Sequence, residues 1–93
     1  MEVGLDYVVF AFDANDPTNG FKYIRIKEKD MDSACQAGAL SIYEDMLKET
    51  FTEEEADYFL SHASFIPVLA SDLGERTPEE FYKEEIMIER KLQ

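Results

Sequence analysis

Few side chains in this chain combine the type and the spacing that site chemistry requires. Asp13-Ala14-Asn15 begins like a calcium-binding EF-hand loop, in which carboxylate and amide oxygens ligate the ion. The pattern then fails, because Thr18 stands where the loop needs glycine and Ile24 where it needs a bidentate glutamate. One histidine and one cysteine supply too few ligands for a zinc site. We therefore expect no specific metal site.

The two single-copy reactive residues, Cys35 and His62, both have structural interpretations. Cys35 falls in the first turn of an expected helix, where the dipole lowers a thiol pKa, but it also lies on the apolar stripe of that helix. His62 closes another expected helix, and Ser61 and Ser64 beside it are typical of local hydrogen bonding. The sequence contains neither a G-x-S-x-G elbow nor a glycine-rich phosphate loop. We expect no catalytic residue, no bound cofactor and no enzyme activity.

Acidity is the strongest signal in the sequence. The 93 residues carry 21 Asp and Glu against 9 Lys and Arg, a net charge of −12 at pH 7. The imbalance is segregated, because residues 1–29 hold 5 acids and 4 bases whereas residues 30–93 hold 16 acids and 5 bases. Such a charge disfavours binding to nucleic acid or an anionic membrane and favours a partner with a basic surface.

Carboxylates spaced four residues apart on a helix are the candidate contact groups. Asp45 and Glu49 have this spacing, as do Glu80 and Glu84. Each such pair destabilises a helix by about 0.2–0.5 kcal/mol, so retaining it invites a functional explanation, although mutational drift leaves the same trace. The expected negative face comprises Glu44, Asp45, Glu49, Glu80, Glu84, Glu85 and Glu89. Tyrosine suits the centre of an interface, so Tyr43, Tyr58 and Tyr82 are candidate anchors, each with the alternative of a place at the core edge.

These observations favour a non-enzymatic acidic binding protein that inhibits or regulates its partner by covering a basic surface, including one that binds nucleic acid. A solvated acidic face with no specific partner is one alternative. Another is a structural or assembly module, such as a homodimer. The basic cluster Lys22, Arg25, Lys27 and Lys29 is expected to pair with acids of the chain's own helices or of a second copy, because the rest of the molecule repels a polyanion.

The N-terminal third reads as a β-hairpin. Residues 3–12 are rich in β-branched and aromatic types, and residues 7–12 are apolar on both alternating faces, which predicts a central strand. Turn formers follow at residues 13–20, and residues 21–27 read as the second strand. Residues 65–70 fit either an edge strand or a buried extended loop, since Pro67 cannot donate to a strand ladder.

Three helices complete the expected fold. The first spans residues 30–50. Its cap is expected to be Ser33, in an S-x-x-Q box, with Asp30 and Asp32 as competing caps. Its apolar stripe consists of Cys35, Ala39, Ile42 and Met46. Gly38 lowers the helix propensity by about 1 kcal/mol relative to alanine, a cost that close approach of a neighbouring element usually offsets.

The other two helices begin with recognisable capping signals. Thr52 and Glu55 form a capping box that predicts a helix over residues 53–62. Thr77, followed by Pro78, predicts a helix that runs to about Leu92 and presents Phe81, Ile88 and Leu92 on one face.

The elements assemble into one α+β domain over residues 1–93, with a small N-terminal antiparallel β-hairpin, and a third edge strand as an option, packed against three helices. No run of apolar residues is long enough for a transmembrane helix. The first residues carry acids where a signal peptide carries positive charge, so we expect a cytoplasmic protein.

Overall fold

The centre of the fold is a strand buried on both of its faces. The structure, a computed structural model, describes residues 4–87. Strand β1 (Leu5–Asp13) lies between β2 (Phe21–Glu28) and β3 (Ala63–Leu69) and pairs antiparallel with both. Residues 7–12 are at most 3% exposed, which confirms the predicted central strand. The hairpin is also confirmed, and Pro67 lies on the edge strand β3, opposite Val9.

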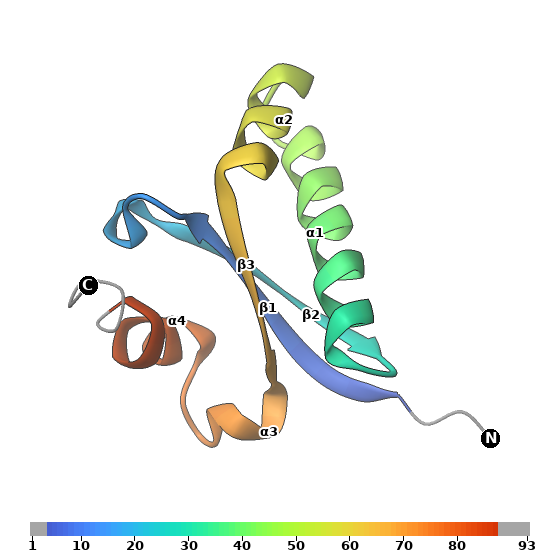
Figure 1. The fold of residues 1–93 in the computed structure, drawn as a ribbon, viewed down its shortest axis with the longest axis vertical. Coiled ribbons are helices and arrows are strands. Elements are labelled where there is room, and N and C mark those ends of the chain that lie inside the picture. The colour runs from blue at the N-terminus through green and yellow to red at the C-terminus, as the bar shows by residue number, and fades with distance from the viewer. Residues whose placement is uncertain (1–3, 88–93) are drawn as a thin grey trace.

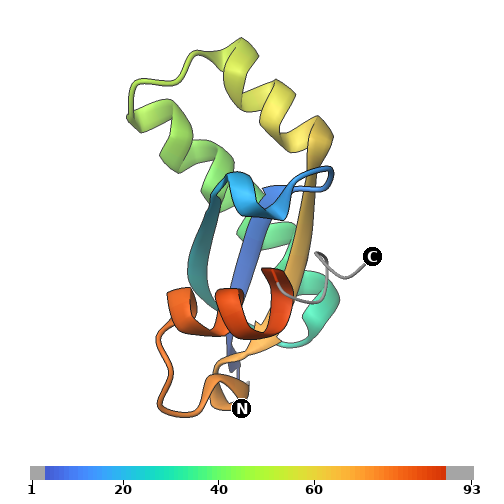
Figure 2. The ribbon, with the colours of Figure 1, turned by 90° about the vertical axis from the view of Figure 1, so that its left-hand side faces the viewer.

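Helices cover both faces of this sheet (Figure 1). Helix α1 (Met31–Lys48) and helix α2 (Glu53–His62) pack on the face that carries Val9 and Ala11. Helix α3 (Ala70–Leu73), helix α4 (Pro78–Phe81) and the π-helix η2 (Tyr82–Met87) lie against the face that carries Val8, Phe10 and Phe12. Figure 2 is viewed from the α4 side, with α4 and η2 in front of the strands and α1 behind them. The chain is therefore a three-layer α+β domain.

Side-chain caps begin the helices close to the predicted positions. The backbone N–H of Ser33 donates to Asp30 Oδ1 at 2.8 Å, so Asp30 is the cap of α1 and the expected Ser33 box does not form. Thr52 and Glu55 form the predicted capping box of α2, with bonds of 2.8 and 3.1 Å. Thr77 caps α4 in the same way, through Glu80.

The buried stripe of α1 is rotated from the predicted one. It consists of Ala34, Gly38, Ile42 and Met46, whereas Cys35 and Ala39 are half-buried. The reason is the close approach of the sheet at Gly38, where a Cβ would lie 2.7 Å from Val9 Cγ2. The prediction that a neighbouring element explains this glycine is confirmed.

The C-terminal segment also differs in detail from the expected helix. It starts at Pro78 as predicted but changes to π-helical winding at Tyr82. Tyr82 and Ile86 are buried, whereas Phe81 of the predicted face is only half-buried. Ile88 and Leu92 lie outside the described residues.

The turn between β1 and β2 contains the short 3₁₀ helix η1 (Pro17–Asn19). Its carboxylates cap local backbone, because Asp13 Oδ1 accepts from the N–H of Asn15 and Asp16 Oδ1 from that of Thr18. Within residues 4–87, no helix is both long enough and apolar enough to cross a membrane.

Candidate protein-binding surface

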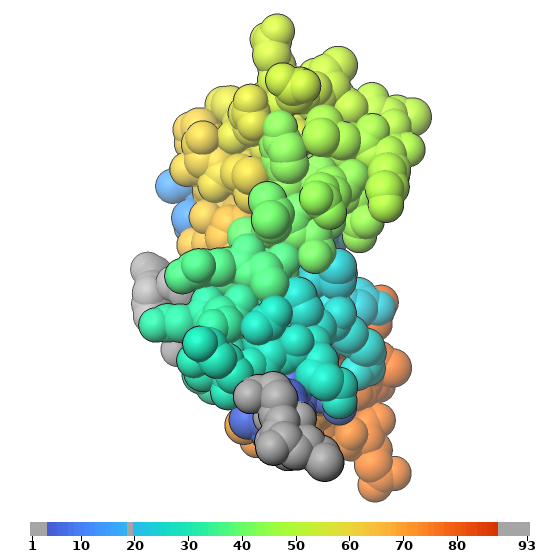
Figure 3. Space-filling model, turned by 90° about the vertical axis from the view of Figure 1, so that its right-hand side faces the viewer, coloured from blue at the N-terminus to red at the C-terminus, as the bar shows by residue number. Residues whose placement is uncertain are grey.

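The first acidic region is the end of the molecule where α1 turns into α2. We call residues 44–57 the acid end; it carries one base, Lys48. Its seven carboxylate residues, all exposed, are Glu44, Asp45, Glu49, Glu53, Glu54, Glu55 and Asp57. Figure 3 shows this segment as the yellow-green surface at the top of the molecule. Among its carboxylates, only that of Glu49 forms an ion pair with a described residue, at 3.6 Å from Lys22 Nζ.

Tyr43, on α1, lies near two carboxylates of α2. Partial burial of its hydroxyl, and then the neighbouring Asp57 and Glu53 carboxylates, raise the pKa of Tyr43 above its ordinary value. A half-buried tyrosine therefore lies beside acids of the acid end.

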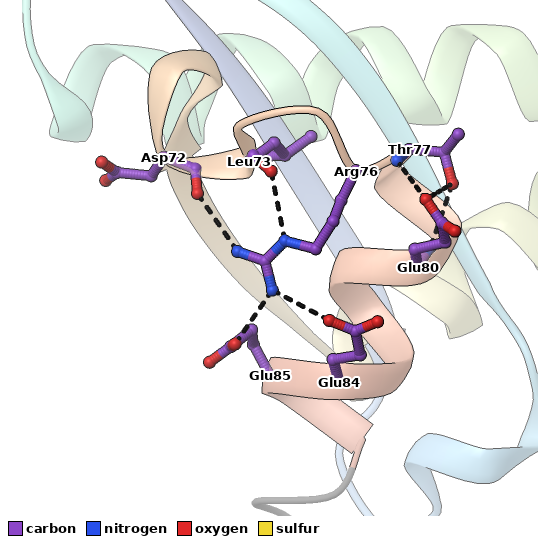
Figure 4. Close-up of polar contacts among 7 residues, drawn as sticks. All are labelled: Asp72, Leu73, Arg76, Thr77, Glu80, Glu84 and Glu85. Carbon is purple, nitrogen blue, oxygen red and sulfur yellow. Dashed lines mark hydrogen bonds and ion pairs between the residues drawn. The ribbon is translucent and has the colours of Figure 1, made fainter.

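The second acidic region spans residues 72–85 and is here named the C-terminal acidic region. It carries six acids and two bases. Arg76 lies among its carboxylates and donates to Glu84 Oε1 at 3.1 Å and to Glu85 Oε2 at 3.0 Å (Figure 4). The same guanidinium donates to the carbonyls of Leu73 and Asp72, at 3.1 and 3.3 Å. The Arg76 guanidinium therefore neutralises two carboxylates and also closes the α3–α4 turn.

Two other acids of this region also form hydrogen bonds within the chain. Glu80 completes the α4 capping box, and Glu79 Oε2 accepts from the Tyr23 hydroxyl at 3.2 Å. Burial, and then the neighbouring Glu79 carboxylate, raise the pKa of Tyr23. Fewer carboxylates are therefore available to bind an external partner in this region than in the acid end.

The residues expected to form one negative face are divided by the sheet. Glu44, Asp45 and Glu49 are in the α1 layer, whereas Glu80, Glu84 and Glu85 are in the α4–η2 layer on the other side. Glu89 lies outside the described residues. The structure therefore brings the α1 acids together with the α2 acids, and not with those of η2.

The three candidate tyrosines lie in different environments. Tyr58, on α2, is 67% exposed, and Tyr43 is half-buried. Tyr82 is 1% exposed, its ring stacks on Phe21 at 3.9 Å between centroids, and its hydroxyl donates to the Pro17 carbonyl at 2.6 Å. Tyr82 is a core residue and is not on the surface.

A pocket of about 390 Å³ opens beside the acid end, between α1, α2 and the β1–β2 turn. Its apolar wall includes Phe51, Tyr58 and Phe59, and its polar residues include Asp13, Glu55 and Lys22. The Lys22 ammonium lies 5.2 Å from the centroid of the Phe51 ring, within the range of a cation–π contact. Sequence reasoning did not find this pocket, because its walls come from two segments that are distant in the sequence, residues 13–22 and residues 46–63.

The remaining chemistry-bearing residues have structural contacts. His62 stacks on Tyr58 with 4.1 Å between ring centroids, and its Nδ1 lies 2.9 Å from the Tyr58 carbonyl oxygen. Lys22 pairs with Glu49 at the end of α1, as predicted, whereas Lys27 pairs at 3.3 Å with Asp6 of strand β1 and not with an acid of a helix. In the described part of the chain, no three His, Cys, Asp or Glu side chains are placed to hold a metal ion.

No protein-family model, curated protein or solved structure matches this chain. The candidate surface is therefore argued from its own geometry.

Proposed function

We propose that this chain is a non-enzymatic acidic binding protein that inhibits or regulates a partner by covering a basic surface of it. The observation that carries the proposal is the acid end: seven exposed carboxylates within 14 residues, with one base among them and a single ion pair to the rest of the described chain. A second support is the aromatic pocket that adjoins these carboxylates. An apolar centre with a charged rim is the usual anatomy of a protein interface.

The spacing of the carboxylates suits a partner that binds nucleic acid. Asp45 on α1 and its C-cap Glu49, and Glu53 and Asp57 on α2, are each four residues apart, a spacing that places Cβ atoms about 6 Å apart along a helix. Neighbouring phosphates along a DNA strand have a comparable separation. A rigid row of carboxylates complements a groove of Lys and Arg and excludes nucleic acid from it.

The test compares two variants of equal charge in affinity capture from an extract of the producing cell. The acid-end variant carries Glu44→Gln, Asp45→Asn and Glu49→Gln, and the control variant carries Asp72→Asn, Glu75→Gln and Glu79→Gln. We expect the unmodified chain and the control to retain a partner that salt elutes and that DNA competes for, and the acid-end variant to lose it. Equal retention by both variants would contradict the proposal.

One observation favours a second candidate function, a homo-oligomeric assembly module. Leu40 and Leu47 are seven residues apart on α1 and are 60% and 39% exposed, so they share an outward face of the helix. Light scattering after gel filtration separates the two functions. A dimer that Leu40→Glu dissociates would favour assembly, and a monomer at all concentrations would remove that candidate.

A further inference from the structure

The pocket beside the acid end has the features of a receptor for a single cationic side chain. Its lining contains three aromatic side chains, Phe51, Tyr58 and Phe59. Tyr58 is 67% exposed and is held in place by stacking on His62. Aromatic faces attract cations through their quadrupole, and most strongly where water is partly excluded.

The chain's own Lys22 already shows this chemistry at one wall. Its ammonium lies over the Phe51 ring at 5.2 Å and pairs with Glu49 at 3.6 Å. A cation is thus held between an aromatic ring and a carboxylate on the α1 side of the pocket. On the α2 side, Tyr58 and Phe59 have no cation over them among the described residues.

Two further carboxylates line the same pocket and retain an unused oxygen. Asp13 uses Oδ1 for the backbone N–H of Asn15, and Glu55 uses Oε1 for that of Thr52. The second oxygen of each has no donor within the described chain. A planar guanidinium stacks on an aromatic ring and donates to carboxylates in its own plane, whereas an ammonium is more strongly hydrated and makes point contacts.

We propose that this pocket receives an arginine side chain of the basic partner, stacked on Tyr58 and paired with Asp13 and Glu55. The inference rests on the proposed function, because it names the residue of the basic surface that the acid end recognises. Charge complementarity selects this occupant: an apolar side chain would leave both carboxylates desolvated and unpaired, and an acidic one would be repelled by seven neighbouring carboxylates.

The test uses three capped hexapeptides in which glycine alternates with arginine, lysine or citrulline. Each is titrated into the ¹⁵N-labelled full chain at low salt, and backbone amide shifts report both affinity and location. We expect the arginine peptide to bind about threefold more tightly than the lysine peptide, with its largest shifts around Tyr58 and Asp13. The neutral citrulline peptide is expected not to bind.

Tyr58→Ala is expected to bring the arginine-to-lysine affinity ratio close to one without weakening the lysine peptide. Leu40→Ala is the control, because it also shortens an exposed side chain on a helix but lies outside the pocket. Equal binding of both cationic peptides along the acid end would refute the arginine site in the pocket but would not contradict the proposed function. Absence of binding by either peptide at low salt would overturn both.

Discussion

The acid end and the C-terminal acidic region have nearly the same content of acids, yet their carboxylates have different surroundings. Residues 44–57 hold seven acids, and residues 72–85 hold six. In the C-terminal acidic region, Arg76 bonds two carboxylates and the side chains of Glu79 and Glu80 bond Tyr23 and Thr77. In the acid end, Glu55 accepts from the backbone N–H of Thr52, and one lysine from β2 reaches one glutamate.

The difference lies in where the chain places its cations. Arg76 stands in the α3–α4 turn, within reach of η2 and over the Phe81 ring at 4.9 Å. Lys48 in the acid end forms no ion pair with a described residue. The fold brings fewer counter-charges to the acid end than to the C-terminal acidic region, and for this reason we propose the acid end as the contact surface.

The largest contrast is expected between Tyr82 of the C-terminal acidic region and Tyr58, which directly follows the acid end, in how strongly each ring is held by the core. Tyr82→Ala removes a buried ring that stacks on Phe21, and should lower the free energy of unfolding by about 3–5 kcal/mol. Tyr58→Ala, in the exposed ring of the pocket, should change it by no more than about 0.5 kcal/mol. Urea unfolding followed by circular dichroism measures both, and equal losses would contradict this assignment.

A smaller effect is expected where α1, which carries Glu44 and Asp45 of the acid end, packs against the sheet. Gly38→Ala places a Cβ within 2.9 Å of three Val9 side-chain atoms. Overpacking of about 1–3 kcal/mol should exceed the helix-propensity gain of about 1 kcal/mol, for a net loss of up to about 2 kcal/mol.

Adding Val9→Ala to Gly38→Ala should give a favourable coupling energy in a double-mutant cycle, because the clashing methyl groups are then gone. If Gly38→Ala alone stabilised the protein by about 1 kcal/mol, the close contact between α1 and β1 would be disproved.

The counter-charges themselves provide a sharper comparison. Arg76→Gln should lower the thermal stability, because two carboxylates lose their shared cation and the α3–α4 turn loses part of its closure. Lys48→Gln should change the thermal stability much less, because Lys48 forms no ion pair with a described residue. Thermal unfolding at low salt measures both. Equal effects would show that the two regions are neutralised to the same degree.

The smallest effect is expected at a carboxylate outside both regions. Hydrogen bonds from Ser33, first from its backbone N–H and then from its side chain, lower the pKa of Asp30. A lowered folded-state pKa means that the carboxylate stabilises the fold above the ordinary pKa of aspartate and loses this effect as the pH falls through the folded value.

Asp30→Asn keeps a capping oxygen but does not titrate at this position. The stability of the unmodified chain should therefore fall relative to this variant below about pH 4, and stay parallel to it above about pH 5. Unfolding curves that remain parallel from pH 6 to pH 3 would contradict the capping role of the carboxylate.

Local signals in the sequence predicted the local structure well. The Thr52 and Thr77 capping boxes depend on residues three apart, and both form. The doubly apolar pattern of residues 7–12 correctly indicated a central strand, because only a strand covered on both sides tolerates apolar residues at every position.

Long-range placement was not predictable in the same way. Nothing in the spacing of Glu49 or Glu84 tells which face of the sheet its helix covers, so one expected negative face became two. The rotated stripe of α1 has a similar origin, since Gly38 contributes no hydrophobicity to the pattern and is buried because Val9 meets it. The pocket was missed because it exists only after β1, β2 and α2 are assembled.

The central claim is that the partner binds the acid end and not the C-terminal acidic region. The most direct test measures the dissociation constant between the purified partner and each of the two charge-matched triple variants. At low salt, Glu44→Gln/Asp45→Asn/Glu49→Gln should weaken binding by about tenfold and Asp72→Asn/Glu75→Gln/Glu79→Gln by less than about twofold, with the gap narrowing near 0.15 M salt. Equal weakening by the two variants, or none by the first, would contradict the claim.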